Sequence, residues 1–328
     1  MRNDKVYFVF DDPGDRDKMK ILLDYETREY KQIYPKNKLR TPKQMLSFVN
    51  SFLENTYDSD TIVFWYDFMG ILCYWICKLK RINRKIIILN ILLKNKTTKK
   101  NKLAKFLYRS VLKDESVVST VTSAEYGEWL NDLLRIKRHH YLLHDIYYGD
   151  AVLKTECRDN VVFCGGRNGR DWDKVIEIAN KMSDVCFNCV MPSSVWNEKG
   201  KFFPSNAVVK YDIPESEFLY ILQKSKFMVM PLDTESPAGL VAIFQAGMYK
   251  KMVITSNTVT TREYITSDRG ALCSDSIDDW VETINFYLNN DGETVKKAEN
   301  FNRFLNDICS AKVYASQLFK LVEESRNG

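Results

Sequence analysis

The sequence lacks several features that would assign it to a common class of protein. No apolar run approaches the length of about 18 residues that spans a membrane. The opening residues, MRNDKVYFVFDD, do not predict a signal peptide, because acidic residues flank an apolar run that is too short. The eight cysteines show no paired spacing, which favours a reducing, cytoplasmic setting over a disulfide framework. We find no solenoid-type repeat and no low-complexity linker.

Acidic residues are also unevenly distributed. None lies between Asp67 and Asp114, where lysine and arginine recur, and residues 1–150 carry 27 basic against 19 acidic side chains. A solvated basic face is the ordinary interpretation of such a run. The apolar residues within it make the run compatible with contact to an anionic membrane surface, at the inner face of a membrane. These residues are Trp75, Ile76, Phe106 and Leu107. No recognised nucleic-acid-binding module accompanies them, so we predict no nucleic-acid partner.

The chain of 328 residues, 45% of them hydrophobic, is long enough for two domains with substantial cores. Short apolar runs that read as buried strands alternate with segments of helical pattern. The clearest strand candidates are residues 5–10, 61–66, 85–90, 116–121, 160–164, 185–191 and 208–213. This alternation predicts an α/β protein built from doubly wound parallel sheets, with Rossmann-like domains over 1–150 and 151–328.

The stretch KFMVMPLDTESPAGLVAIFQAGMYKKMVITS, from Lys226 to Ser256, predicts a strand, a loop, a helix and a second strand. Such a βαβ unit places the loop 233–239 at the carboxyl end of a parallel sheet, where ligands bind. Gly239 permits close approach to the backbone, and the start of the helix favours an anion such as a diphosphate. Glu235 and Ser236 lie in this loop and could bond the hydroxyls of an attached group. Many loops of this composition bind nothing, and that alternative stays open.

A second glycine-rich turn, GGRNGRDW, follows the strand at 160–164. It carries Arg167 and Arg170, and Lys174 follows. Guanidinium groups bind phosphate oxygens in a bidentate fork, which makes both arginines candidates for a phosphate site. Exposed arginines without a ligand are the equal alternative.

The order Pro231, Glu235, Gly239-Leu240-Val241, Gln245-Ala246, Val253-Ile254 resembles the donor-binding region of retaining glycosyltransferases of family 4. Those enzymes have the GT-B fold, in which two Rossmann-like domains face each other across a cleft. In the family pattern a first Glu contacts the donor sugar and a second Glu the nucleotide ribose. The resemblance therefore implies these roles for Glu235 and for Gln245, which replaces the second Glu. Lys250 and Met252 stand where the family has Gly and Pro.

The resemblance implies a function as well as a fold. It predicts transfer of a sugar, with retention, from a UDP- or GDP-sugar to a glycan or lipid-linked acceptor, in bacterial polysaccharide biosynthesis. The first domain would bind the acceptor and the second the donor, and the last helix can cross back to the first domain. No cofactor and no metal are expected, because arginines and a helix start can stabilise the leaving diphosphate. The implied catalytic residues are Glu235 and Arg170. The implied donor-binding residues are Gly166, Arg167, Arg170, Ser236, Gly239, Leu240 and Gln245.

Two other functions remain open from the sequence. Gln245, and the absence of the family's usual Lys-Gly, also fit a catalytically silent GT-B partner protein. A sugar-nucleotide epimerase on the same fold is the second, and it would need acidic and histidine groups in the cleft.

Several patterns favour structural roles over chemistry. Asp58-Ser59-Asp60 precedes a strand instead of following one, unlike the metal-binding DxD of the other large glycosyltransferase fold. Cys73 and Cys77 lack further ligands and are expected to be core thiols. The histidines, at 139, 140 and 144, are expected at a hinge or on the surface. Asp11 or Asp12 could bind an acceptor hydroxyl, although a plain turn explains them as well.

Overall fold

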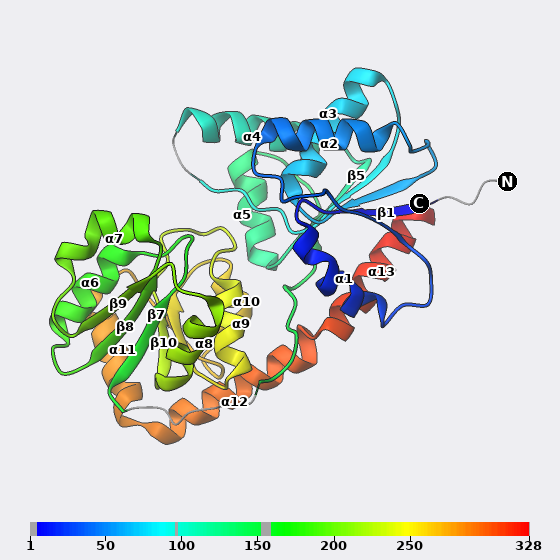
Figure 1. The fold of residues 1–328 in the computed structure, drawn as a ribbon. Coiled ribbons are helices and arrows are strands. Elements are labelled where there is room, and N and C mark those ends of the chain that lie inside the picture. The colour runs from blue at the N-terminus through cyan, green and yellow to red at the C-terminus, as the bar shows by residue number, and fades with distance from the viewer. Residues whose placement is uncertain (1–4, 96–97, 152–158, 328) are drawn as a thin grey trace. The chain divides into compact units, whose positions relative to one another are not determined.

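The structure is a computed structural model that describes residues 5–95, 98–151 and 159–327 (Figure 1). The chain forms two compact units. Unit 1 comprises Met1–Ile146 together with Ala311–Gly328, and unit 2 comprises Tyr147–Ser310. Each unit contains one six-stranded sheet with helices on its faces. The predicted α/β class with two Rossmann-like units is confirmed.

Unit 1 is built on parallel strands in the order β2-β1-β3-β4-β5-β6. The strands are β1 (Val6–Val9), β2 (Lys31–Ile33), β3 (Thr61–Phe64), β4 (Lys85–Ile88), β5 (Val117–Val121) and β6 (Tyr141–Leu142). The helices are η1 (Pro13–Asp15), α1 (Arg16–Leu23), α2 (Pro42–Leu53), α3 (Asp67–Lys80), α4 (Lys99–Leu112), α5 (Ala124–Leu134) and α13 (Ala311–Asn327). Strands β1 and β3 are buried along their whole length, because helices cover both faces of the sheet.

Helix α2 begins where the sequence predicts. The Thr41 side chain accepts a hydrogen bond from the backbone of Gln44, whose side chain accepts one from the Thr41 N–H. This capping box, with Pro42 in the first helical turn, fixes the start of the helix. On the other face of the sheet, α1 and the distant α13 share one core, in which the Phe8 and Phe319 rings lie 6.0 Å apart.

Unit 2 has the parallel order β12-β11-β10-β7-β8-β9. The strands are β7 (Val161–Gly165), β8 (Cys186–Met191), β9 (Ala207–Tyr211), β10 (Phe227–Met230), β11 (Val253–Ser256) and β12 (Ala271–Cys273). The helices are α6 (Trp172–Lys181), α7 (Ser193–Lys199), η2 (Gly200–Phe202), α8 (Glu215–Lys224), α9 (Leu240–Met248), α10 (Thr261–Tyr264), α11 (Ile277–Asn289) and α12 (Asp291–Ile308). The order reverses beside β7, since β8 lies on one side of it and β10 on the other. Such a switch point is where open α/β sheets bind ligands.

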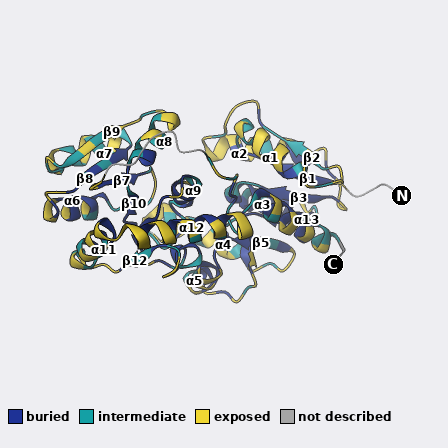
Figure 2. Ribbon diagram, turned by 90° about the horizontal axis from the view of Figure 1, so that it is seen from below, coloured by how far each residue is buried: buried dark blue, intermediate teal, exposed yellow. Residues whose placement is uncertain are grey.

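The helices of unit 2 cover both faces of its sheet. One core holds Trp172 of α6 and Trp280 of α11, and the opposite core holds Ile243 of α9 and Phe301 of α12. Helix α9 approaches α12 closely, since a Cβ at Gly247 would lie 2.3 Å from Leu305 Cδ1. Buried and exposed residues alternate along α12 in Figure 2, as expected of a helix with one face in the core.

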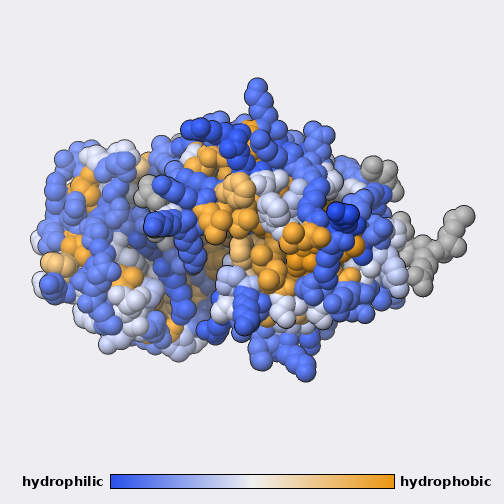
Figure 3. Space-filling view, turned by 90° about the horizontal axis from the view of Figure 1, so that it is seen from above, coloured by the Kyte–Doolittle hydropathy of each residue, from blue (hydrophilic) through white to orange (hydrophobic). Residues whose placement is uncertain are grey.

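The surface carries both charged and apolar side chains. Figure 3 shows apolar residues grouped over unit 1 among hydrophilic ones. Throughout the described ranges, every helix is too short or too polar to cross a bilayer.

Candidate functional site

Two loops meet at the carboxyl edge of the sheet in unit 2. One follows β7 (166–171) and the other follows β10 (231–239). The Asp171 N–H donates to Pro231 O at 3.0 Å, and the Asp233 N–H donates to Gly169 O at 3.1 Å. Arg170 and Leu232 form an isolated antiparallel bridge between them. These bonds join the two glycine-containing loops that the sequence singled out into a single surface.

Arg170 lies at the centre of this surface. Its Nε donates to Gly165 O at 2.9 Å, and its Nη1 donates to Asn168 O at 2.7 Å. A Cβ at Gly166 would lie 2.0 Å from Arg170 Nη2, and a Cβ at Gly239 would lie 3.1 Å from Nη1. The guanidinium therefore lies between two glycines, and a side chain at either position would crowd it.

The electrostatic environment of this guanidinium is unfavourable without an anion. Burial lowers the pKa of Arg170 to about 10, although the charge of Asp233 acts in the opposite direction. Asp233 acts on Arg170 through its charge, and within the described part of the chain no hydrogen bond joins the two side chains. The group remains positively charged at neutral pH, yet backbone carbonyls are its only hydrogen-bond partners among those residues. A partly buried cation with these neighbours favours a bound anion.

The start of α9 adds a second positive feature beside Arg170. Gly239 is the N-cap residue, with φ of +85°, and no side chain caps the helix. Its first N–H groups therefore carry the partial positive charge of a helix terminus. Leu240, the first helical residue, is buried and anchors the turn. Arg170 and the α9 terminus repel one another electrostatically, and an anion between them would relieve that repulsion.

Glu235 and Ser236 occupy different positions in the loop after β10. Glu235 Oε2 accepts a hydrogen bond from the Val259 N–H at 2.8 Å, and the Thr260 hydroxyl donates to the Glu235 carbonyl at 2.8 Å. Glu235 therefore also holds the loop that follows β11. Ser236 is buried, and its N–H donates to Thr234 Oγ1 at 3.2 Å. Glu235 is the more accessible of the two.

Gln245 has a partner that sequence reasoning missed. Its Nε2 donates to Glu215 Oε1 at 2.8 Å, although the two residues are 30 positions apart. Helices α8 and α9 both leave the carboxyl edge of the sheet, and this bond joins the first residue of α8 to the second turn of α9. The carboxylate of Glu215 therefore lies beside the Gln245 side chain. A sequence clue exists, since Pro214-Glu215 opens the helix after β9.

The second arginine of the β7 loop lies elsewhere. Arg167 is exposed and lies near Asp212. The pKa of Asp212 is held below its usual range mainly by hydrogen bonding to Ser193, and the charge of Arg167 lowers it further. Lys174 extends to Asp275 instead, with Nζ 3.0 Å from Oδ1. Of the three basic residues in this segment, only Arg170 lies against both Gly166 and Gly239.

The carboxyl edge of the sheet in unit 1 carries three aspartates. Asp12 caps η1 through the Gly14 N–H and pairs with Lys38 at 2.7 Å, and these bonds lower its pKa. Burial raises the pKa of Asp11. Asp67 is fully enclosed, and burial raises its pKa to about 6. Its oxygens accept from two backbone N–H groups and from the Tyr108 hydroxyl, a set of contacts typical of a structural carboxylate.

His140 is buried in unit 1, so the expectation of a hinge or surface position is wrong for this residue. Its Nδ1 lies 2.8 Å from Ser119 Oγ and its Nε2 lies 3.2 Å from Asn131 Oδ1. Because both ring nitrogens have partners, the imidazole is satisfied in the core, and burial lowers its pKa to about 4. Cys73 and Cys77 are core thiols, as predicted. Across the described residues, no group of three or more His, Cys, Asp or Glu side chains is arranged to hold a metal ion.

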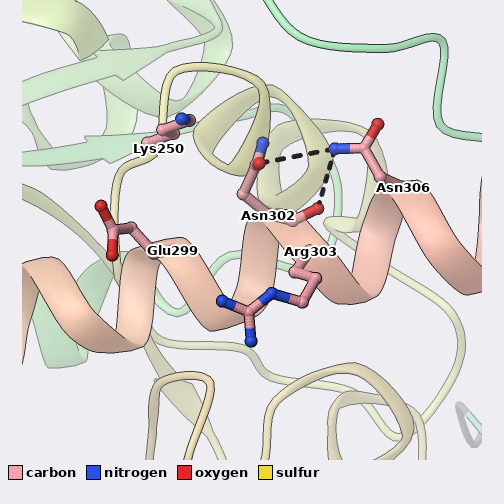
Figure 4. Close-up of a pocket in the computed structure, with 5 residues that line it drawn as sticks. All are labelled: Lys250, Glu299, Asn302, Arg303 and Asn306. Atoms are coloured by element: carbon pink, nitrogen blue, oxygen red, sulfur yellow. Dashed lines mark hydrogen bonds between the residues drawn. The ribbon is translucent and has the colours of Figure 1, made fainter.

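A polar pocket of about 410 Å³ lies beyond the other end of α9, against α12 (Figure 4). It is lined by Lys250, Glu299, Asn302, Arg303 and Asn306. The Asn302 amide donates to Asp150 Oδ1 at 2.6 Å and to Gly247 O at 3.0 Å. In Figure 4, Asn306 bonds to Asn302 and Arg303 points away from both. These asparagines join the chain near Asp150 to α9, and the pocket is separate from the loops around Arg170.

Comparison with known proteins shows similarity in structure. No protein-family model matches the sequence, and no curated protein sequence matches it. The structure is similar to sucrose-phosphate synthase from Thermosynechococcus elongatus, with a TM-score of 0.76, 11% identity and 98% of each chain covered. It is also similar to HepE from Anabaena in complex with UDP-glucose, with a TM-score of 0.72, 10% identity and 97% and 99% of the two chains covered. A glycosyltransferase from Rickettsia africae matches with a TM-score of 0.67, 13% identity and 99% of each chain covered. The chain therefore has GT-B, the two-unit α/β fold of these glycosyltransferases, as the sequence predicted.

Proposed function

We propose that this protein is a glycosyltransferase that moves a sugar from a nucleotide-sugar donor to a glycan or lipid-linked acceptor. The position of Arg170 is the observation that carries the proposal. Its partly buried guanidinium lies against Gly166 and Gly239, beside the uncapped start of α9, and among the described residues its hydrogen-bond partners are backbone carbonyls while Asp233 acts on it only through its charge. A diphosphate matches this surface because it is anionic, has several acceptor oxygens and can approach the backbone of both glycines.

This arrangement suits the chemistry of the leaving group. Negative charge develops on the diphosphate as the bond to the sugar breaks, and fixed donors aimed at that charge lower the barrier. Arg170 and the first N–H groups of α9 supply such donors. Arg170 also supplies a positive charge of the kind that a divalent metal provides in other enzymes, so we propose a metal-independent reaction.

The remaining donor contacts follow from the two loops. Glu235 would orient the sugar through its second carboxylate oxygen, while the bond from Val259 keeps the side chain in place. The carboxylate of Glu215, held by Gln245, would accept hydrogen bonds from the ribose hydroxyls. A phosphate contact by Arg167 rests on the resemblance alone, because its exposed side chain lies near Asp212.

The finer parts of the proposal rest on the resemblance to family 4. They are retention at the anomeric carbon, a hexose or related sugar, and a role in bacterial polysaccharide biosynthesis. Unit 2 would bind the donor and unit 1 the acceptor, with Asp11 at the carboxyl edge of its sheet as one candidate contact. HepE is described as a complex with UDP-glucose, and this supports testing UDP-sugars first.

Calorimetric titration with UDP and GDP, followed by hydrolysis assays with their sugar conjugates, tests the proposal. Arg170→Met keeps a side chain similar to the aliphatic part of arginine and removes its charged donors. We expect it to weaken UDP binding by about tenfold to a hundredfold, since a hydrogen bond to a charged group is worth about 1.5–3 kcal/mol. Lys174→Met is the matched control, because Lys174 faces Asp275, and it should bind UDP as the wild type does.

Each alternative function has its own result in these assays. Failure of the wild type to bind any nucleoside diphosphate, or normal binding by Arg170→Met, would contradict the donor site. Binding without hydrolysis or transfer of any donor would favour a silent partner protein. Recovery of an epimerised nucleotide sugar would favour the epimerase.

A further inference from the structure

Helix α4 of unit 1 has an outer surface that combines apolar and basic side chains. We call this surface the α4 face, and it comprises Lys99, Lys102, Leu103, Phe106, Arg109 and Lys113. Leu103 and Phe106 are each 60% exposed. Their spacing of three residues places both on the same side of the helix, with the cations around them. The opposite side of α4 is already packed, because Tyr108, Val111 and Leu112 are buried in the unit.

The surroundings of Phe106 combine an apolar floor with a cationic rim. A shallow cavity of about 260 Å³ lies between α4 and α5, and Leu133 and Leu134 contribute its apolar lining. Lys105, Arg109 and Arg135 supply three positive charges to the same cavity. Figure 3 shows apolar side chains exposed over unit 1, with hydrophilic side chains projecting around them.

No acidic residue lies between Asp67 and Asp114 in the sequence, so α4 and the segment before it carry charge of one sign. The occupant of this surface must therefore be anionic. It must also offer hydrocarbon to Leu103 and Phe106, since exposed apolar groups of this size gain free energy when they leave water. An anionic lipid surface meets both requirements at once.

We propose that the α4 face docks this protein on an anionic lipid surface, with Leu103 and Phe106 inserted among the lipids and the surrounding cations at the headgroups. A nucleic acid would satisfy the charges and could stack on Phe106. The lipid surface is favoured because Leu103, Leu133 and Leu134 are aliphatic and have no aromatic ring on which a base can stack. None of the residues of the α4 face belongs to the donor site, so this inference does not depend on the proposed reaction.

Co-sedimentation of the full chain with vesicles tests the proposal. We expect binding to vesicles that contain phosphatidylglycerol and little binding to pure phosphatidylcholine. Phe106→Asp should lower the partition coefficient by about tenfold or more, because a buried Phe side chain is worth about 1.5–3 kcal/mol. Lys102→Gln combined with Arg109→Gln should lower it by about thirtyfold, at about 1 kcal/mol per cation near the surface. A salt concentration of 1 M should weaken binding further, because it shortens the Debye length from about 10 to about 3 Å.

The controls separate docking from loss of the fold. Phe202→Asp changes an aromatic residue of unit 2 that is 56% exposed and lies beside Lys201, and it should bind the vesicles as the wild type does. Every variant should keep the wild-type melting temperature. Equal binding to neutral and anionic vesicles, or wild-type binding by Phe106→Asp, would overturn the proposal. Tight binding of a DNA oligonucleotide without vesicle binding would overturn it in favour of a nucleic-acid surface.

Discussion

The close contact between Gly166 and the Arg170 guanidinium leads to a specific prediction. Gly166 has φ of +131°, a conformation that other residues rarely adopt, and a Cβ there would lie 2.0 Å from Arg170 Nη2 and 2.4 Å from its Cζ. Gly166→Ala must therefore strain the backbone and displace the guanidinium. The backbone strain alone costs about 1–3 kcal/mol. For a unit of this size, that corresponds to a fall in melting temperature of about 3–10 °C.

The same substitution should impair nucleotide binding, because the displaced Arg170 no longer faces Gly239. Titration of UDP by calorimetry should show an affinity at least about tenfold lower, the value of one hydrogen bond to a charged group. Gly292→Ala is the control, since Gly292 lies in α12 and a Cβ there would have no neighbour within 4 Å. It should leave UDP affinity unchanged and should maintain the free energy of unfolding or raise it by up to about 1 kcal/mol.

Two outcomes would refute this reasoning. If Gly166→Ala melts at a lower temperature but binds UDP with wild-type affinity, the position of Arg170 against Gly166 is not what holds the diphosphate. If its melting temperature is unchanged, the backbone at Gly166 tolerates a side chain and the strain argument fails.

Three further predictions follow from single contacts. Gln245→Glu would place two carboxylates at hydrogen-bond distance and weaken UDP binding, and adding Glu215→Gln in the same chain should restore the affinity. The analogue of UDP that lacks both ribose hydroxyls should bind all these variants equally. If Glu215→Gln alone still preferred UDP over this analogue as the wild type does, the ribose contact would be refuted. Burial lowers the pKa of His140 from 6.5 to about 4, because the folded protein favours the neutral imidazole. The free energy of unfolding should therefore fall by about 3 kcal/mol as the pH is lowered from 6.5 to about 4. Asp67, whose pKa is raised to about 6, has the opposite effect on stability between pH 3.8 and 6. Comparing the urea midpoints of the wild type and His140→Gln across this pH range therefore isolates the contribution of the histidine. If the midpoints of both proteins changed with pH at the same slope, the assignment would be contradicted. Glu235→Gln keeps an acceptor for the backbone N–H of the loop after β11, so it should retain stability but lose turnover. Glu235→Ala should lose turnover and also about 1 kcal/mol of unfolding free energy. Wild-type turnover in Glu235→Gln would show that the carboxylate takes no part in the reaction.

Most of the fold could be predicted because the buried strands are short, continuous apolar runs. The run at 85–90 contains β4 (Lys85–Ile88), and the run at 160–164 overlaps β7 (Val161–Gly165). The elements that were missed lack such runs. Strand β6 has only two residues, both exposed, and α7 (Ser193–Lys199) has no buried residue to produce a periodic pattern.

The positions of the site residues were harder to predict than the elements that carry them. The sequence placed Arg167 and Arg170 in one loop, but their different directions depend on bonds from that loop to Pro231 and Asp233. Glu215 was missed for the same reason, because its bond to Gln245 joins two helices across 30 residues of sequence. His140 was assigned to a hinge or the surface because its partners, Ser119 and Asn131, come from other elements.

The division of the chain into units has a consequence for its synthesis. Unit 2 is one continuous segment, so it can fold as soon as it has left the ribosome. Unit 1 cannot, because its core includes Leu318, Phe319 and Val322 of α13, which are translated after the whole of unit 2. Until then the apolar face around Phe8 and Met19 stays exposed, and a nascent chain stalled at residue 310 would be a natural client for a chaperone.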